Sequence, residues 1–262
     1  MRTNSVKRAI REGRPTIGTW LSLASILAAE RMAQAGFDWL TIDLEHSPTN
    51  WETAMAMSAV VAAQGVAPLV RVPSSSDENI KRALDLGAYG IVAPMVTSPD
   101  QARAVVASCK YPPQGVRSLA GGRNDLGWDT DSATYFAHAN DEIFVCIQIE
   151  HTDALDRLDD ILAVPGVDCA FVGPQDLTAS LGIQPPQLDS PDPRYEKALV
   201  QVLDAGRRHG VGVGLMVASA HQARRRWDQG FTMVALAAEV RILTAAAVQA
   251  VKEIKSGSPV SA

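Results

Sequence analysis

The chain has 262 residues and is 47% hydrophobic, with 24 basic and 29 acidic side chains. An apolar fraction of this size is typical of a globular protein and excludes collagen-like, coiled-coil and disordered chains. The net charge of −5 disfavours a nucleic-acid partner, because phosphate binding calls for a basic face. No apolar run reaches the ~18 residues of a membrane span, and none near Met1 resembles a signal peptide. We therefore predict a cytoplasmic protein without membrane partners.

Short apolar runs recur along the chain, separated by segments with helical patterns. We predict strands at 16–21, 39–43, 68–72, 90–93, 143–149, 169–172, 212–216 and 232–236. Several of these runs lack polar alternation, as expected of strands that are buried on both faces of a parallel sheet. Roughly eight strand–helix repeats in about 240 residues predict an α/β fold of the (β/α)8 TIM-barrel type. A doubly wound open sheet is the alternative.

Helix start and stop signals lie between these strands. Thr49-Asn50-Trp51-Glu52 fits a capping box, and Ser98-Pro99 places proline at the first position of another helix. Glycines that we expect to end helices are Gly36, Gly65, Gly87, Gly210 and Gly230. We predict a single barrel domain over 1–255, a long glycine- and aspartate-rich loop over 120–140, and a flexible tail over 256–262.

Several predicted strands end in charged or amide side chains. These side chains are Asp43, Glu45 and His46 after the second strand, Arg71 at the third, Gln148, Glu150 and His151 at the fifth, and Gln175 and Asp176 after the sixth. The carboxyl ends of barrel strands form the active-site face in this fold. A single charge at a strand end is usually only the solvated edge. Complementary charges on several strand ends predict a site.

Glu150 and Asp176 are candidate metal ligands. Two carboxylates suit a hard divalent cation such as Mg²⁺ or Mn²⁺, with water and substrate oxygens in the remaining positions. The neighbouring His151 keeps zinc open as an alternative, although the three cysteines have no CxxC spacing. The alternative for Asp176 is the N-cap of a short helix over 177–181.

Asp43, His46 and Arg71 are candidates for proton transfer and charge stabilisation. A carboxylate three residues before His46 can fix the imidazole tautomer and raise its basicity, while a loop histidine without a catalytic role is the alternative. The guanidinium of Arg71 offers a planar fork for a carboxylate or an enolate oxygen, or for a structural partner. With a metal, these groups suit the stabilisation of an enolate next to a carbonyl. A Schiff-base lysine is disfavoured, because every lysine falls in a helical or terminal segment.

An ordered series of motifs resembles the HpcH/HpaI aldolase family of metal-dependent pyruvate aldolases. The motifs are Gly36-Phe37-Asp38-Trp39 through Ile42-Asp43-Leu44-Glu45-His46-Ser47-Pro48, and those at 69–72, 87–96, 111–117, 148–150 and 171–177. The similarity runs from about Gly18 to Lys255. It implies a TIM barrel whose last helix packs on a neighbouring subunit, in a homo-hexamer built as a trimer of dimers.

The resemblance also implies roles for individual residues. His46, oriented by Asp43, would be the base, acting through a metal-bound water. Glu150 and Asp176 would bind the metal. The substrate-binding residues would be Arg71, Gln148, the backbone around Gly173, Pro174 and Gln175, Asp85, which reaches a neighbouring subunit's site, and Met216.

The predicted reaction is the reversible cleavage of a 4-hydroxy-2-oxo acid to pyruvate and an aldehyde, through an enolate stabilised by Mg²⁺, Mn²⁺ or Co²⁺. The alternatives are a CoA-ester lyase of the citrate-lyase β-subunit type, phosphoenolpyruvate chemistry on a related barrel, and a non-catalytic metal and oxo-acid binding barrel. The sequence departs from the family at His151, where threonine or serine is expected. It also departs at 235–241, where the family has a glycine/serine–aspartate ending. Both departures bear on the aldehyde side of the pocket.

Overall fold

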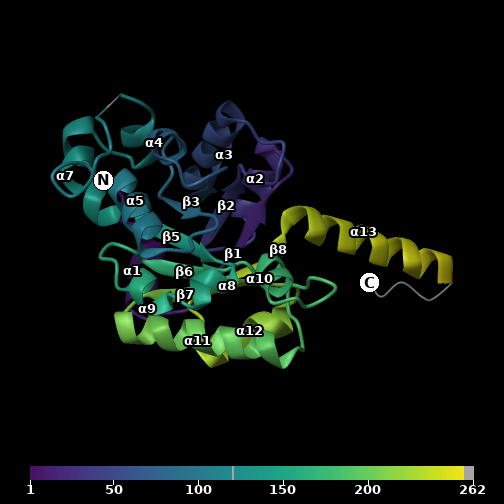
Figure 1. Cartoon of the computed structure of the whole chain (residues 1–262). Coiled ribbons are helices and arrows are strands. Elements are labelled where there is room, and N and C mark those ends of the chain that lie inside the picture. The colour runs from purple at the N-terminus through teal and green to yellow at the C-terminus, as the bar shows by residue number, and fades with distance from the viewer. Residues whose placement is uncertain (120, 257–262) are drawn as a thin grey trace.

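Parallel strands form a closed barrel in the computed structural model, which describes residues 1–119 and 121–256 (Figure 1). Each strand is hydrogen-bonded to the next in chain order, and β8 pairs with β1 to close the ring. The strands are β1 (Thr16–Leu21), β2 (Trp39–Asp43), β3 (Ala67–Arg71), β4 (Gly90–Ala93), β5 (Phe144–Ile149), β6 (Cys169–Val172), β7 (Gly212–Val217) and β8 (Met233–Ala238). The predicted (β/α)8 barrel is confirmed, and the open sheet is wrong.

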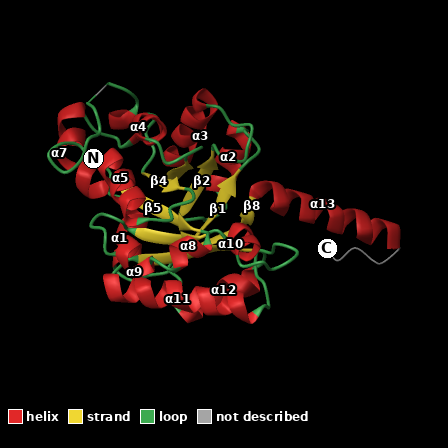
Figure 2. Cartoon of the chain, in the orientation of Figure 1, coloured by secondary structure: helices red, strands yellow, loops and turns green. Residues whose placement is uncertain are grey.

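Helices surround the barrel on its outer side (Figure 2). They are α1 (Ser5–Arg11), α2 (Ile26–Ala33), α3 (Trp51–Ala63), α4 (Asp77–Asp85), α5 (Pro99–Cys109), α6 (Asn124–Gly127), α7 (Ser132–Glu142), α8 (Thr152–Leu155), α9 (Leu158–Leu162), α10 (Pro174–Ser180), α11 (Pro193–His209), α12 (Ala220–Gln229) and α13 (Glu239–Ser256). No helix in the described part of the chain is long and apolar enough to cross a membrane.

The last helix, α13, projects away from the barrel (Figure 1). Glu239 at its start is buried, and the rest of the helix is exposed or half-buried. The tail predicted from position 256 begins too early, because Ser256 is still the last residue of α13. The remaining tail positions, 257–262, lie outside the described residues.

The segment predicted as a long loop, 120–140, is mostly helical. It holds α6 and most of α7, while Ala120 lies outside the described residues. The side chain of Asp131 caps α7 by accepting the N–H of Thr134 at 2.9 Å. The prediction was wrong because an aspartate before a helix has the same composition signal as an aspartate in a loop.

The helix start signals are confirmed at α5 and shifted by one residue at α3. Ser98 caps α5 as predicted. Before α3 the N-cap is Asn50, whose side chain accepts the N–H of Thr53 at 2.8 Å. The hydroxyl of Thr49 instead accepts a hydrogen bond from Ser47 at 2.7 Å. The turn after β2 is therefore held at both ends by short polar side chains.

Aromatic side chains fill the barrel beneath the carboxyl ends of its strands. The ring centroid of Trp20 lies 4.9 Å from that of Phe171 and 5.7 Å from that of Trp39. Trp39 fits because position 18 is glycine, where a Cβ would lie 2.1 Å from the indole. Trp20 and Phe171 also line a pocket above this layer, so the packed core forms the floor of the candidate site. The glycines predicted to end helices all have positive φ, as expected: Gly36, Gly65, Gly87, Gly210 and Gly230.

Candidate active site

A pocket of about 260 Å³ opens at the carboxyl ends of the barrel strands. The predicted site residues that line it are Asp43, His46, Arg71, Gln148, Gly173, Pro174, Gln175, Asp176 and Met216. They lie on segments that are distant in sequence, and closure of the barrel brings them together. The face chosen from the polar strand ends is therefore the face that carries the pocket.

Arg71 lies between two carboxylates at the edge of this pocket. The strand register pairs Asp43 directly with Arg71, so the two side chains leave neighbouring strands at the same level. The Nε and Nη2 atoms of Arg71 donate to the two oxygens of Asp43 at 2.9 and 2.6 Å. Its Nη1 lies 3.2 Å from an oxygen of Glu45. The guanidinium is 12% exposed, so this charged group has structural partners and still faces the pocket.

Glu45 is a site residue that the sequence analysis did not assign. Burial raises the pKa of its carboxyl group, and the positive charge of Arg71 opposes that rise. Its Oε1 lies 3.8 Å from the Nε2 of His46. The sequence did contain a signal for Glu45, because it lies directly after β2 in the same segment as Asp43 and His46.

His46 is held by the turn that follows β2, with 67% of its side chain exposed. An oxygen of Asp43 accepts the backbone N–H groups of Glu45 and His46, at 3.0 and 3.2 Å. The expected contact between Asp43 and the imidazole is not among the contacts of the described residues. Both oxygens of Asp43 already bind Arg71, so Asp43 orients the backbone of the turn and Glu45 lies nearest the ring.

Glu150 follows β5 and lies buried beside the pocket, with 4% of its surface exposed. Its oxygens accept the backbone N–H of Met95 at 2.8 Å and the side-chain N–H of Gln148 at 2.9 Å. Burial raises the pKa of Glu150 to about 7, and the neighbouring charge of Asp176 adds to the rise. Glycine at position 173 allows this approach, since a Cβ there would lie 2.0 Å from an oxygen of Glu150.

These residues fit a divalent cation. The Oε1 of Gln148 is buried and has no hydrogen-bond partner among the described residues. No basic side chain donates a hydrogen bond to Glu150 within that part of the chain, and the more distant charge of Arg71 does not offset the effect of burial on its pKa. The donors are carboxylate and amide oxygens, which Mg²⁺ and Mn²⁺ prefer. Residues 1–119 and 121–256 contain no cluster of three or more His, Cys, Asp or Glu suited to a metal. With two carboxylates as ligands, a cation would take its remaining ligands from water and substrate.

Two alternatives for this region are resolved by local geometry. The N-cap of α10 is Gly173, and Asp176 lies in the first turn of the helix, so the expectation of Asp176 as N-cap is wrong. His151 caps α8, where its Nδ1 accepts the N–H of Asp153 at 3.2 Å. Its ring is used at a helix start, which disfavours its role as a zinc ligand.

Asp85 lies outside this pocket. It ends α4 and accepts a hydrogen bond at 2.7 Å from Arg117, whose side chain is fully buried. Asp85 borders a separate surface pocket that Arg123 also lines. Its expected role in a neighbouring subunit's site stays a prediction.

Further residues line the pocket without having been assigned from sequence. They are Trp20, Ser22, Phe171, Leu188, Ala238, Val240 and Arg241. The end of β1 carries no charge that could have marked Trp20 and Ser22. Leu188 lies in the connection between α10 and α11, and Arg241 lies in the first turn of α13; no local pattern predicts that either reaches the pocket. The departure noted at 235–241 was the one available signal for Arg241.

A family model described as HpcH/HpaI aldolase/citrate lyase matches residues 16–246, a range that includes every strand of the barrel. The chain belongs to this family. The resemblance inferred from the ordered motifs is thereby confirmed.

Similar proteins support this assignment. The chain is 39% identical to a hydroxypyruvate/pyruvate aldolase of Deinococcus radiodurans, over 94% of this chain and 87% of the relative. It is 37% identical to a 4-hydroxy-2-oxo-heptane-1,7-dioate aldolase of Shigella sonnei, over 93% and 92%. A solved HpcH/HpaI aldolase/citrate lyase family protein of Burkholderia cenocepacia is 38% identical, with a TM-score of 0.89 over 97% of this chain and 100% of that one. Together with the family match, these relatives make this family member a lyase of the aldolase type.

Proposed function

We propose that the protein is a divalent-metal-dependent aldolase that reversibly cleaves a 4-hydroxy-2-oxo acid to pyruvate and an aldehyde. The observation that carries the proposal is the shared pocket. Asp176, Arg71 and His46 line it, and Glu150 lies buried beside it, bound by Gln148 of the pocket and close enough to Asp176 for that charge to raise its pKa. Membership of the HpcH/HpaI family supports this chemistry.

Glu150 and Asp176 are the residues that would hold the cation, next to the unpaired amide oxygen of Gln148. A bound Mg²⁺, Mn²⁺ or Co²⁺ supplies Lewis-acid stabilisation of the charge that develops on the 2-oxo oxygen.

The pyruvate portion of the substrate lies between Gln148, Arg71 and the start of α10. Gly173 and Pro174 begin this helix, and no side chain caps it. The N–H groups of its first turn are therefore free of a side-chain cap, as in many sites for carboxylates. Arg71 offsets developing negative charge, and its two carboxylate partners keep its planar fork in place.

His46 takes the proton of the 4-hydroxyl group. As that proton leaves, the C3–C4 bond breaks, the aldehyde carbonyl forms at C4, and the electron pair remains on the three-carbon fragment. A proton added at C3 then completes pyruvate. Glu45, close to the Nε2 of His46, stabilises the protonated imidazole between these steps.

The proposed enzyme is a cytoplasmic homo-hexamer, a trimer of dimers in which α13 packs on a neighbouring subunit. An exposed helix with apolar side chains calls for such a partner. The exposed apolar residues of α13 are Leu243, Val248, Val251 and Ile254. Sedimentation velocity of the purified protein tests the assembly, and a monomer at micromolar concentration contradicts it.

The reaction is tested by pyruvate release from 4-hydroxy-2-oxo acids with Mn²⁺, Mg²⁺ or Co²⁺, before and after treatment with a chelator. We expect activity to vanish on chelation and to return with the cation. Full activity after thorough metal removal contradicts the mechanism. Exchange of the pyruvate methyl protons in deuterium oxide separates an enzyme from a binding protein, because a protein that only binds pyruvate leaves those protons in place.

A further inference from the structure

Arg241 is a charged group in the pocket that the proposed chemistry does not use. It lies in the first turn of α13 and lines the pocket, together with Ser22 and Met216. Across residues 1–119 and 121–256 no hydrogen bond or ion pair involves its guanidinium. Arg71, which also lines the pocket, is already shared between two carboxylates. Arg241 is therefore the arginine of this pocket that remains free to bind a ligand.

The position of Arg241 is fixed by a buried carboxylate two residues earlier in the chain. Glu239, 4% exposed, accepts the backbone N–H of Leu23 at 2.7 Å, that of Ser22, and the Ser22 hydroxyl at 3.1 Å. These bonds join the start of α13 to the segment after β1. Just before it, Ala237 has a left-handed φ of 50°, a conformation that is costly for alanine and is often found at functional sites. The chain is thus held at this corner in a defined conformation.

The barrel order places Arg241 away from the metal-binding residues. Glu150 follows β5 and Asp176 follows β6, whereas Arg241 follows β8, with β7 between. The pyruvate portion occupies the side of Glu150 and Asp176. The substrate beyond C4 then extends toward the side of the pocket formed by β8 and β1, where Arg241 and Ser22 lie.

We propose that Arg241 binds an anionic group at the far end of the aldehyde fragment, so that the enzyme favours substrates with an acid group at both ends. The planar guanidinium can donate two parallel hydrogen bonds to a carboxylate or to a phosphate. The inference rests on the proposed aldolase function, because it assigns a subsite of the same pocket. Arg241 acts on substrate selection, and the bond cleavage is carried out by the residues described above.

The test is the aldol reaction of pyruvate with matched pairs of aldehydes. One pair is 4-oxobutanoate and butanal, and the other is glyceraldehyde 3-phosphate and glyceraldehyde. For each pair the acid-to-neutral ratio of kcat/KM is measured in the unchanged enzyme, Arg241→Gln and Arg241→Lys. The control is Arg224→Gln on α12, an exposed arginine that lies over the ring of Trp227 and does not line the pocket.

We expect Arg241→Gln to lower the ratio by about tenfold or more, mainly through KM of the acid aldehyde. Arg241→Lys should recover part of it, and Arg224→Gln should leave it unchanged. The pair with the larger loss shows whether the bound group is a carboxylate or a phosphate. An equal ratio in all variants overturns the role of Arg241, provided that pyruvate methyl exchange is intact. Absence of that exchange in the unchanged enzyme contradicts the proposed function and, with it, this inference.

Discussion

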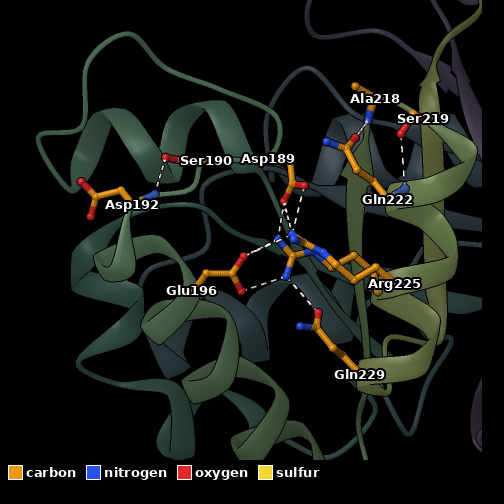
Figure 3. A network of polar contacts seen from close by, with 10 residues as sticks. Asp189, Ser190, Asp192, Glu196, Ala218, Ser219, Gln222, Arg225 and Gln229 are labelled. Carbon is orange, nitrogen blue, oxygen red and sulfur yellow. Dashed lines mark hydrogen bonds and ion pairs between the residues drawn. The ribbon is translucent and has the colours of Figure 1, made fainter.

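Two clusters in this protein each hold an arginine between two carboxylates, and within the described residues only one of them lines a pocket. On the flank of the barrel Arg226 of α12 is fully buried and binds Glu196 at 2.8 and 3.0 Å. It also contacts Asp189, which Arg225 approaches at 3.1 Å (Figure 3). The carboxylates and the neighbouring Gln229 surround the guanidinium, so no room is left for a ligand.

At the barrel mouth, an arginine between two carboxylates does line a pocket. Arg71 is bound by Asp43 and Glu45 and still lines a pocket. Beside it, Gln148 keeps a buried oxygen without a partner, and burial raises the pKa of Glu150, to which no basic side chain of the described residues donates a hydrogen bond. Paired charges alone therefore do not identify a functional site. The Nε of Arg226 also lacks a hydrogen-bond partner, so the open pocket beside the pair is what distinguishes the cluster at the barrel mouth.

The strongest test of this comparison removes one carboxylate from each region. Glu150→Gln keeps the shape of the side chain and its neighbours, and replaces an anionic oxygen donor with an amide. We expect kcat/KM for pyruvate release to fall by about 10³-fold, with loss of Mn²⁺ binding in calorimetry. The matched control, Glu196→Gln on the flank, should retain activity. Near-normal activity in Glu150→Gln rules out the proposed metal site.

The next largest effect on activity is expected when the arginine of each cluster, Arg71 or Arg226, is replaced by lysine. Lysine keeps the charge and loses the planar fork that binds both oxygens of Asp43. Arg71→Lys should therefore lower kcat/KM by about 10²-fold in steady-state assays. Arg226→Lys, with the same chemical change, should lower kcat far less. If the two variants lose activity equally, the distinction between the clusters is wrong.

A smaller effect is expected when Gly173, whose lack of a side chain makes room for the carboxylate of Glu150, is replaced by alanine. The φ of Gly173 is −83°, so alanine is allowed by the backbone and only the contact with Glu150 changes. Gly173→Ala should displace that carboxylate and weaken Mn²⁺ binding by about 10–100-fold in calorimetry. Gly121→Ala is the control, because a Cβ there meets nothing within 4 Å. An unchanged affinity in Gly173→Ala contradicts the place of Glu150 in the metal site.

The sequence predicted the barrel and the face of it that carries the pocket, because apolar runs and polar strand ends are local patterns. It also predicted that Glu150 and Asp176 lie near each other, since neighbouring parallel strands bring their ends together. The partners of individual side chains could not be predicted. Asp43 binds Arg71 because β2 and β3 pair in that register, and register is a property of the closed sheet.

The places of Leu188 and Arg241 in the pocket could not be predicted from sequence patterns for a related reason. Leu188 lies in the connection between α10 and α11 and lines the pocket because neighbouring residues are tied to α12. Arg241 lines it because Glu239 joins α13 to the segment after β1. Both placements depend on contacts between distant parts of the chain, and neither leaves a periodic signal.

The flank cluster gives the prediction with the smallest effect on catalysis. Arg226→Gln removes the buried cation between Asp189 and Glu196 and leaves the exposed Arg225 as their remaining cation. Leaving a buried charge without its partner typically costs about 3–5 kcal/mol, and since Arg225 still contacts both carboxylates, we expect the free energy of unfolding in urea titrations to fall by less than that. Since Asp189 follows Leu188, release of the segment should raise KM, while kcat remains close to that of the unchanged enzyme. If Arg226→Gln keeps full stability and loses much of its kcat, the structural role of Arg226 is wrong. Arg226 would then contribute to catalysis, as Arg71 is proposed to do.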